Sequence, residues 1–219
     1  MRRLFVFRPE PGLGQTVERA RAMGLDVASI PLFAVEPVEW NPPDPATFDA
    51  LLLTSASAVV SAGEQMERLR GLPVYAVGEA TALAAEVAGF GVAVTGSAGI
   101  DQLLESVPSE TRLLHLCGEH RREPGAAKPI TRVTVYRARE VPTAAGLHEL
   151  RGQVAAVHSP RAGRRLADLV PEGDRGAVRI AAISEAAAEA VGAGWESVEA
   201  APEPTDSALL ALAARLCDR

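Results

Sequence analysis

An internal repeat constrains this chain more than any other feature of the sequence. The segment 51–55 (Leu-Leu-Leu-Thr-Ser) recurs as 155–159 (Ala-Ala-Val-His-Ser), and 77–80 (Val-Gly-Glu-Ala) recurs as 183–186 (Ile-Ser-Glu-Ala). Two further matches follow in the same order, Gly89-Phe90 with Gly194-Trp195 and Asp101 and Leu104 with Asp206 and Leu209. The period of about 105 residues is much longer than a solenoid repeat, so the sequence predicts two duplicated lobes.

Short apolar runs alternate with helical patterns along the whole chain. The predicted strands are 4–7, 50–54, 74–77, 92–95, 113–117, 133–136, 154–158, 180–183 and 197–200. The predicted helices are 16–23, 56–62, 79–88, 101–107, 163–169, 185–191 and 206–217. Continuously apolar strands separated by helices are typical of parallel sheets covered on both faces. The predicted fold class is therefore α/β, with two similar lobes, each a parallel sheet flanked by helices.

Two stretches interrupt this alternation. Residues 34–43 and 132–142 alternate apolar and polar side chains and contain prolines, which is typical of an exposed two-strand ribbon. We expect them to form a two-stranded antiparallel linker. One lobe is then discontinuous, made of residues 1–33 plus 143–219, and the other covers 44–131. The working site is expected in a cleft between the lobes.

Composition excludes several classes of protein. The formal net charge of −6 disfavours a general nucleic-acid binder. Cys117 and Cys217 lack metal-ligand spacing, and the histidines follow no ligand pattern, so no metal is expected. No apolar run approaches the length of a membrane span, and the apolar start at Leu4–Phe7 is too short for a signal peptide. A cytoplasmic location without membrane contact is expected.

Polar or small residues follow strands at matching places in the two copies. Thr54-Ser55 and His158-Ser159 form one pair of turns, and Gly78-Glu79 and Ser184-Glu185 form the other. The carboxyl ends of strands in open α/β sheets are where ligands bind, and N–H groups and hydroxyls there suit carboxylates or phosphates. Simple helix capping is the alternative for each turn.

Two other motifs are weaker. The glycines in the segment Arg8–Gly14 invite a dinucleotide-binding interpretation, but position 17 is valine where the third glycine would stand, so a plain turn is favoured. His158 beside Ser159 suggests a hydrolase pair, but the G-x-S-x-G elbow is absent.

Basic residues gather locally in an otherwise acidic chain. They are Arg121, Arg122, Lys128, Arg132, Arg137 and Arg139, followed by Arg161, Arg164 and Arg165. A solvated surface is one explanation, and charge-assisted binding of a small polyanion is the other. Tyr136 lies in the predicted linker, where it either covers a hinge or donates a proton to a leaving hydroxide.

In order and spacing, these motifs together resemble the uroporphyrinogen-III synthase family, over nearly the whole chain. The resemblance rests on Arg8-Pro9, Leu53-Thr54-Ser55, the segment 77–82, Val135-Tyr136, Ser159-Pro160 and the segment 202–205. It implies two α/β lobes joined by a two-strand ladder, in a monomer. It also implies a lyase of tetrapyrrole (heme, siroheme, cobalamin, chlorophyll) biosynthesis, which cyclises the octacarboxylate hydroxymethylbilane with loss of water and inversion of ring D. No cofactor or metal is implied, and transient contact with hydroxymethylbilane synthase is possible for such an enzyme.

The resemblance also assigns roles to residues. Tyr136 is the candidate general acid, and the implied substrate-binding residues are Arg8, Thr54, Ser55, Gly78, Glu79, Thr81, Arg137, His158, Ser159 and Ser184. The second copy departs from the family pattern, because His158 replaces a small residue and because Ser184 and Ala187 stand where the first copy has Gly78 and Thr81. Backbone contacts are expected to replace hydroxyl contacts there. The alternative function is a two-lobed, non-catalytic protein that binds small anions or regulates.

Overall fold

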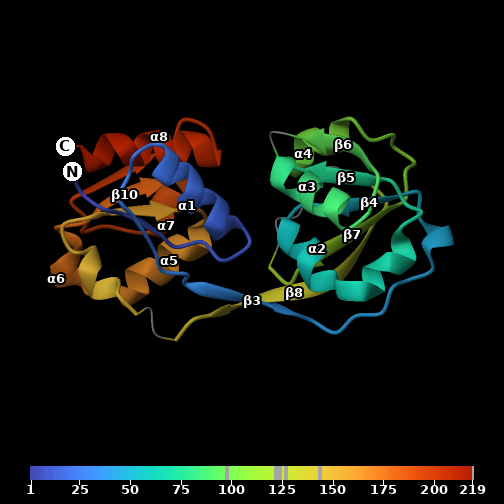
Figure 1. The fold of residues 1–219 in the computed structure, drawn as a ribbon, viewed down its shortest axis with the longest axis horizontal. Coiled ribbons are helices and arrows are strands. Elements are labelled where there is room, and N and C mark those ends of the chain that lie inside the picture. Colours follow the sequence, from blue (N-terminus) through green and yellow to red (C-terminus); the bar gives the residue numbers. More distant parts are fainter. Residues whose placement is uncertain (97–98, 121–124, 126–127, 143–144, 219) are drawn as a thin grey trace. The chain divides into compact units, whose positions relative to one another are not determined.

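The computed structural model describes residues 1–96, 99–120, 125, 128–142 and 145–218. The chain divides into two compact units (Figure 1). Unit 1 comprises Met1–Ala34 and Glu140–Arg219, and unit 2 is Val35–Arg139. Each unit has its own sheet and its own buried core, so each is described by itself.

Unit 1 is built on a parallel sheet with the strand order β11-β10-β9-β1-β2. The strands are β1 (Leu4–Val6), β2 (Val27–Ser29), β9 (Val154–Val157), β10 (Arg179–Ala182) and β11 (Ser197–Ala200). The helices are α1 (Gly12–Ala22), η3 (Leu147–Leu150), α5 (Pro160–Leu169), α6 (Glu172–Arg175), α7 (Glu185–Ala190) and α8 (Asp206–Cys217). From β1 the chain crosses through α1 to β2 at one side of the sheet, and from β9 it crosses through α5 to β10 towards the other side. Because both crossovers are right-handed, α1 and α5 lie on opposite faces. Helices α1 and α8 share one core cluster with Leu4 and Val6.

Unit 2 is built on a sheet with the strand order β3-β8-β7-β4-β5-β6. The strands are β3 (Phe33–Pro37), β4 (Ala50–Leu53), β5 (Val74–Val77), β6 (Val92–Gly96), β7 (Leu113–Gly118) and β8 (Ile130–Glu140). The helices are η1 (Pro45–Thr47), α2 (Ala56–Ala62), η2 (Gly63–Leu69), α3 (Glu79–Val87) and α4 (Ile100–Glu105). Helices α2 and α3 pack on Leu51 and Leu53, and α4 packs on Leu52, because successive strand residues face opposite sides.

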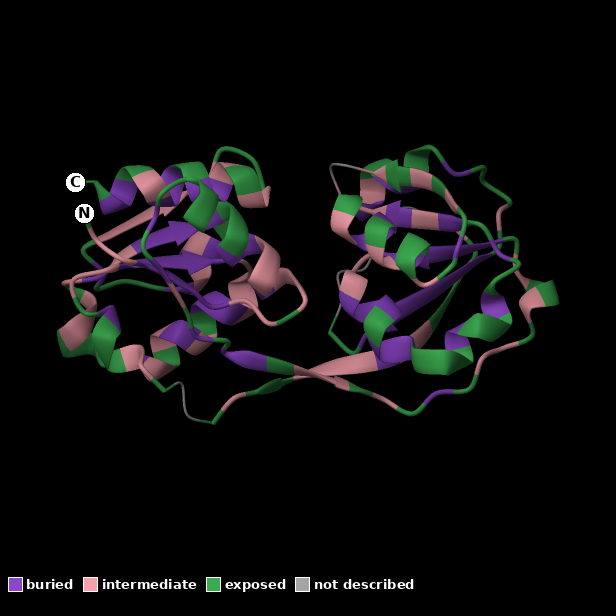
Figure 2. Cartoon of the chain, viewed as in Figure 1, coloured by how far each residue is buried: buried purple, intermediate pink, exposed green. Residues whose placement is uncertain are grey.

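The repeat seen in the sequence appears as a shared strand order. Strands β4, β5 and β6 correspond to β9, β10 and β11, and in both sheets the next two positions follow in the same order, β7 and β8 in unit 2 and β1 and β2 in unit 1. The predicted α/β class is confirmed, as are the helix-covered parallel strands. The buried strands and the banded burial of the helices are visible in Figure 2.

The sheet of unit 2 is mixed rather than purely parallel, because β3 joins it. The N–H of Val38 bonds to the C=O of Val135, and the N–H of Val141 bonds to the C=O of Leu32, so β3 and β8 run antiparallel. This antiparallel pair involves Phe33–Pro37 and part of Ile130–Glu140, and the linker bounds 34–43 and 132–142 stay predictions. Strand β8 is longer than predicted because it also pairs in parallel with β7. The predicted lobe bounds and the cleft expected between the lobes stay predictions.

Some elements differ from those predicted. Helix α5 begins at Pro160 rather than residue 163, because Ser159 Oγ accepts the N–H of Ala162 at 3.1 Å and Pro160 suits the first helical turn. The short elements η2 and α6 were not predicted, since each is too brief to show a helical period. In the described part of the chain, no helix is long and apolar enough to cross a membrane.

Candidate functional site

In unit 2, three neighbouring parallel strands end at one edge of the sheet. Strands β5, β4 and β7 pair in parallel, so their carboxyl ends lie together. Thr54 and Ser55 follow β4, and Gly78 follows β5. Ser55 caps α2, with its Oγ accepting the N–H of Ser57 at 3.1 Å. The structure thus brings the predicted residues after β4 and β5 to one edge.

His115 holds the Thr54 hydroxyl from the neighbouring strand. It lies on β7, its side chain is buried with 1% of the residue exposed, and its Nε2 is 3.1 Å from Thr54 Oγ1. The sequence did not predict this contact. Only the observed order of the strands, with β7 beside β4, could have identified it.

Tyr136 approaches the same turn from β8. A Cβ built on Gly118 would lie 2.6 Å from the Tyr136 Cζ, so the ring lies directly over the glycine. Burial raises the pKa of Tyr136 above its ordinary value, although a hydrogen bond with Ser55 acts in the opposite direction. The phenol therefore stays protonated at neutral pH and is able to donate a hydrogen bond.

The other predicted residues of unit 2 have more restricted surroundings. Gly78 precedes α3 with a φ of 83°, a left-handed conformation that favours glycine, and Glu79 is exposed in the first turn of this helix. Thr81 is buried within the core. Arg137 is paired on the ribbon, where its Nε donates to Glu36 at 3.2 Å. Thr81 therefore reaches a ligand less readily than Thr54, Ser55 and Tyr136, whereas the side chain of Arg137 is partly exposed but paired.

In unit 1, the predicted residues again follow adjacent parallel strands. Arg8 lies just beyond β1, His158 and Ser159 follow β9, and Ser184 follows β10 by two residues. Ser159 caps α5 and Ser184 caps α7, each by accepting a backbone N–H. A serine hydroxyl that accepts in this way still has a proton to donate to a ligand.

A single carboxylate, that of Asp206, gathers the polar side chains at this edge. Asp206 begins α8, and its Oδ1 accepts hydrogen bonds from Thr16 Oγ1 at 2.8 Å and His158 Nε2 at 3.1 Å. Arg8 Nη1 lies 3.5 Å from the same oxygen, and Arg19 Nη1 lies 3.1 Å from Oδ2. In the sequence Asp206 stands out only as a position of the internal repeat, and no motif marks Thr16 or Arg19 as site residues.

Burial and pairing set the charges in this cluster. Burial acts to raise the pKa of Asp206, but hydrogen bonds from His158 and Thr16 and the nearby Arg8 charge outweigh it, so the pKa lies well below its ordinary value. Burial lowers the pKa of His158 despite its bond to Asp206. At neutral pH an ionised Asp206 therefore faces a neutral His158, whose Nε2–H donates.

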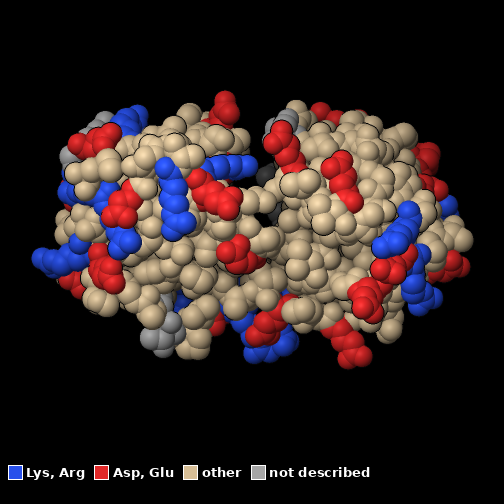
Figure 3. All heavy atoms as spheres, in the orientation of Figure 1, with Lys and Arg blue, Asp and Glu red and all other residues tan. Residues whose placement is uncertain are grey.

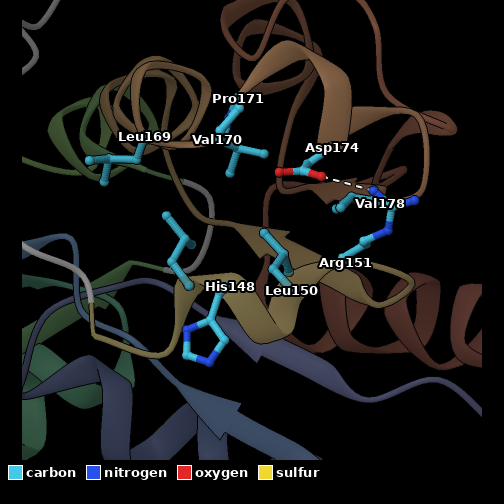
Figure 4. Close-up of a pocket in the computed structure, with 9 residues that line it drawn as sticks. His148, Leu150, Arg151, Leu169, Val170, Pro171, Asp174 and Val178 are labelled. Carbon is cyan, nitrogen blue, oxygen red and sulfur yellow. Dashed lines mark hydrogen bonds and ion pairs between the residues drawn. The ribbon is translucent and has the colours of Figure 1, made fainter.

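A hollow described in unit 1 lies elsewhere. It has a volume of about 280 Å³ and is lined mainly by aliphatic side chains between η3, the end of α5 and α6, with the Arg151–Asp174 ion pair beside it (Figure 4). None of the predicted site residues lines this hollow. We therefore do not assign the candidate site to it.

Cationic and anionic side chains are mixed on the face of the described residues that Figure 3 shows. On the face of unit 1 drawn in Figure 3, Lys and Arg alternate with Asp and Glu. Several of the predicted basic residues are paired, including Arg139 with Glu36 and Arg165 with Glu140. Arg121 and Arg122 lie outside the described residues. Among the described residues, no group of three or more His, Cys, Asp or Glu side chains is arranged to hold a metal.

Comparison with known families shows which family this chain belongs to. A sequence model described as uroporphyrinogen-III synthase HemD matches residues 14–211. The chain belongs to the uroporphyrinogen-III synthase family. Its members are enzymes of tetrapyrrole synthesis, so the interpretation as a non-catalytic binding protein is disfavoured.

Solved structures of uroporphyrinogen-III synthases share the fold. The enzyme from Helicobacter pylori 26695 aligns with 99% of this chain and 100% of its own, with a TM-score of 0.67 and 18% identity. A mutant enzyme from the extremely thermophilic bacterium Thermus thermophilus aligns over 99% and 100%, with a TM-score of 0.53 and 17% identity. At these identities the likeness shows the fold. A comparison with curated protein sequences gave no significant match.

At the unit 1 edge, the side chain of His158 is held inside the protein. Its Nε2 bonds to Asp206 and only 7% of its side chain is exposed, so the ring is not directed at solvent. His158 therefore acts within this polar cluster through its bond to Asp206. Ser159 and Ser184 keep accessible positions as helix caps.

Proposed function

We propose that this chain is the enzyme that converts hydroxymethylbilane to uroporphyrinogen III, with loss of water and inversion of ring D, and hence acts as a lyase. The observation that carries the proposal is the family match over residues 14–211. The two strand-end sites described above support it, since both carry hydroxyls, backbone N–H groups or a guanidinium suited to carboxylates. That both units act on one substrate molecule stays a prediction.

In this proposal Tyr136 assists departure of the hydroxyl. Its phenol is half-buried and its pKa is raised by burial, so it carries its proton at neutral pH. In the proposed reaction it donates this proton as the hydroxymethyl C–O bond breaks, and the hydroxyl leaves as water. Ring D then attacks the resulting cation through its substituted carbon to give a spiro intermediate. The bond from that carbon to its original methylene bridge breaks, the bridge reattaches at the free α-carbon of ring D, and the proton lost there restores the Tyr136 phenol.

Most of the catalytic work in this proposal is positioning. The bilane also cyclises without an enzyme, but without inversion, so the protein must hold the chain in the geometry that favours the spiro route. Orientation of this kind contributes about 7–11 kcal/mol at best. Thr54 and Ser55 in unit 2, and Arg8, Ser159 and Ser184 in unit 1, would hold the substrate carboxylates, together with backbone N–H groups such as those after Gly78.

Product analysis tests the function directly. The purified protein is supplied with hydroxymethylbilane, and the cyclised product is oxidised and separated into type I and type III isomers. Excess type III over a reaction without protein supports the proposal. Type I alone, with measurable binding of the bilane, would instead favour the anion-binding alternative.

The acid role of Tyr136 predicts the behaviour of one substitution. Tyr136→Phe removes the phenolic proton but keeps the ring over Gly118, so we expect turnover to fall severalfold or more with the free energy of unfolding nearly unchanged. The matched control is Tyr75→Phe, which changes the other tyrosine of the chain and lies on β5 beside the α4 core. Equal turnover in the Tyr136→Phe variant and the wild type would remove the acid role.

A further inference from the structure

The guanidinium of Arg8 occupies an unusually confined place for a charged side chain. A Cβ built on Gly12, the first residue of α1, would lie 2.6 Å from Arg8 Nε, so the guanidinium lies against a backbone position that has no side chain. Its Nη1 donates to Thr16 Oγ1 at 3.2 Å, one turn further along α1. Only a third of the side chain is exposed. Gly12 and Thr16 therefore form a seat for this group.

Asp206 completes the seat from α8. Its Oδ1 lies 3.5 Å from Arg8 Nη1 and also accepts from Thr16 and His158, so one oxygen connects three of the side chains at this edge. The second oxygen accepts from Arg19 Nη1. Asp206 is itself only 12% exposed. The Asp206 carboxylate is therefore fixed by the same hydrogen bonds and ion pairs through which it orients Arg8, Thr16 and His158.

The described hydrogen bonds of the Arg8 guanidinium all come from one nitrogen, Nη1. In the described part of the chain, Nε and Nη2 have no hydrogen-bond acceptor. A guanidinium offers paired donors that match the two oxygens of a carboxylate. From this geometry, and on the basis of the proposed function, we propose that Asp206 is a positioning residue that holds Arg8 on Gly12 so that its remaining donors receive a carboxylate of the substrate.

Two effects of Asp206 on an incoming carboxylate oppose each other. Its negative charge repels the ligand, whereas its hold on Arg8 removes the cost of ordering that long side chain. The repulsion is reduced because the charge is shared among Arg8, Arg19, Thr16 and His158. Ordering therefore dominates, and loss of the Asp206 charge weakens substrate binding.

Steady-state kinetics of Asp206→Asn test this role. We expect the KM for hydroxymethylbilane to rise about three- to tenfold while kcat changes less than twofold, because Asp206 acts on binding and not on proton transfer. Glu196→Gln is the matched control, since Glu196 also pairs with two arginines of unit 1, Arg2 and Arg179. This control should lose comparable stability with KM unchanged. An unchanged or lower KM in Asp206→Asn would overturn the proposal, since Asp206 would then only repel the substrate.

Gly12→Ala separates positioning from stability. The added methyl group needs the space that the Arg8 guanidinium occupies, so Arg8 must move while every charge is retained. Alanine is a better helix former than glycine, so stability should be equal or higher. We expect KM to rise at least threefold in this stable variant. A KM equal to the wild-type value would contradict the inference that the position of Arg8 on Gly12 matters for substrate binding.

A binding measurement distinguishes failure of this inference from failure of the proposed function. Citrate serves as a carboxylate probe, and the arginine Nε–H signals of ¹⁵N-labelled protein report its binding, with Arg8 assigned from the missing signal in Arg8→Lys. We expect citrate to shift the Arg8 signal, with severalfold weaker binding in Asp206→Asn and Gly12→Ala. If the wild type makes no type III product but citrate shifts the Arg8 signal and binds the two variants more weakly, the proposed reaction is wrong and the positioning role of Asp206 is supported. If citrate leaves the Arg8 signal unmoved, or binds the variants as tightly, the positioning role fails.

Discussion

Two polar side chains of the candidate sites lie over glycines, Arg8 over Gly12 and Tyr136 over Gly118. In each case the absent Cβ lets a large functional group approach the backbone closely. Neither glycine has the left-handed φ for which glycine is usually retained. Their role is to provide space, and each is therefore open to a substitution that displaces a functional group without removing it.

Gly118→Ala applies this reasoning to Tyr136. The new methyl group would lie 2.6 Å from the Tyr136 Cζ, so the ring must move away from its place beside Ser55. We expect turnover to fall severalfold while the phenol remains present. Gly71→Ala is a suitable control, since a Cβ there meets nothing within 4 Å. Type III product formed at the wild-type rate by Gly118→Ala would show that the position of the ring does not matter.

His158 gives the protein a pH-dependent stability. Because burial lowers its folded-state pKa, the unfolded chain takes up a proton near pH 6.5 while the folded chain does not. The stabilisation is therefore complete above about pH 6.5 and is lost as the pH falls through that value towards the folded-state pKa. Asp206, whose pKa is also lowered, adds a further loss of folding stability only below about pH 4.

Urea unfolding at pH 7.5 and pH 5.5 checks this expectation. The free energy of unfolding should decrease from the higher to the lower pH in the wild type, and it should decrease less in His158→Gln, which cannot titrate. An equal decrease in the two proteins would assign the pH dependence to other groups.

The sequence predicted which residues follow the strands but not which partners hold them. Thr54, Ser55, His158 and Ser159 could be found because a polar residue after a short apolar run marks a strand end. The bonds from His115 to Thr54 and from Asp206 to His158 link distant segments, and they depend on the strand order and on the placement of α8. The hydrophobic periodicity of a single sequence shows neither the strand order nor the placement of α8.

At the scale of elements, α5 and α7 pack closely at a glycine. A Cβ on Gly163 would lie 3.0 Å from both the carbonyl oxygen of Ala187 and a methyl carbon of Val191. The two helices follow adjacent strands, β9 and β10, and begin at the caps Ser159 and Ser184. The spacing of these two caps is therefore set in part by the absence of a side chain at position 163.

Gly163→Val tests this packing. The branched side chain must force α5 from α7, and overpacking of this kind costs about 1–3 kcal/mol of unfolding free energy. Arg164→Val is the control, because it places the same residue at an exposed position of the same helix. Denaturant unfolding of the two variants should differ by at least about 1 kcal/mol, and equal stabilities would show that the contact at Gly163 relaxes without cost.

Element boundaries were predictable where local chemistry marks them. The predicted ranges 56–62 and 206–217 coincide with α2 and α8, and Ser55 and Thr205 cap these helices. Strand β8 was predicted as 133–136 but spans Ile130–Glu140, because pairing with β7 and β3 extends it beyond its most apolar part. Pairing with these two strands sets the length of β8, and the local sequence pattern does not show which strands will pair.

At the scale of the whole molecule, each unit has its own core and its own tryptophan. Trp40 is buried in the unit 2 cluster with Leu51 and Leu69, and Trp195 is buried in unit 1. The core clusters described for the two units share no residue. The fluorescence of each tryptophan therefore reports on one unit.

This arrangement predicts separable unfolding. In single-tryptophan variants made with Trp40→Phe or Trp195→Phe, adding Gly163→Val should lower the urea midpoint reported by Trp195 and leave the midpoint reported by Trp40 nearly unchanged. A common shift of both midpoints would show that the two units unfold as one cooperative block.

The chain order within the sheets has a consequence for biosynthesis. Unit 2 is a single continuous segment, whereas the sheet of unit 1 combines β1 and β2 with β9, β10 and β11 from the far end of the chain. A nascent chain emerging from the ribosome can therefore complete unit 2 while β1 and β2 wait, without a third strand, for Val154 and the residues that follow. Throughout that interval Arg8, Gly12 and Thr16 already exist but Asp206, which completes the seat, does not. The polar cluster of unit 1 is thus assembled after the segment that forms unit 2, which carries Tyr136.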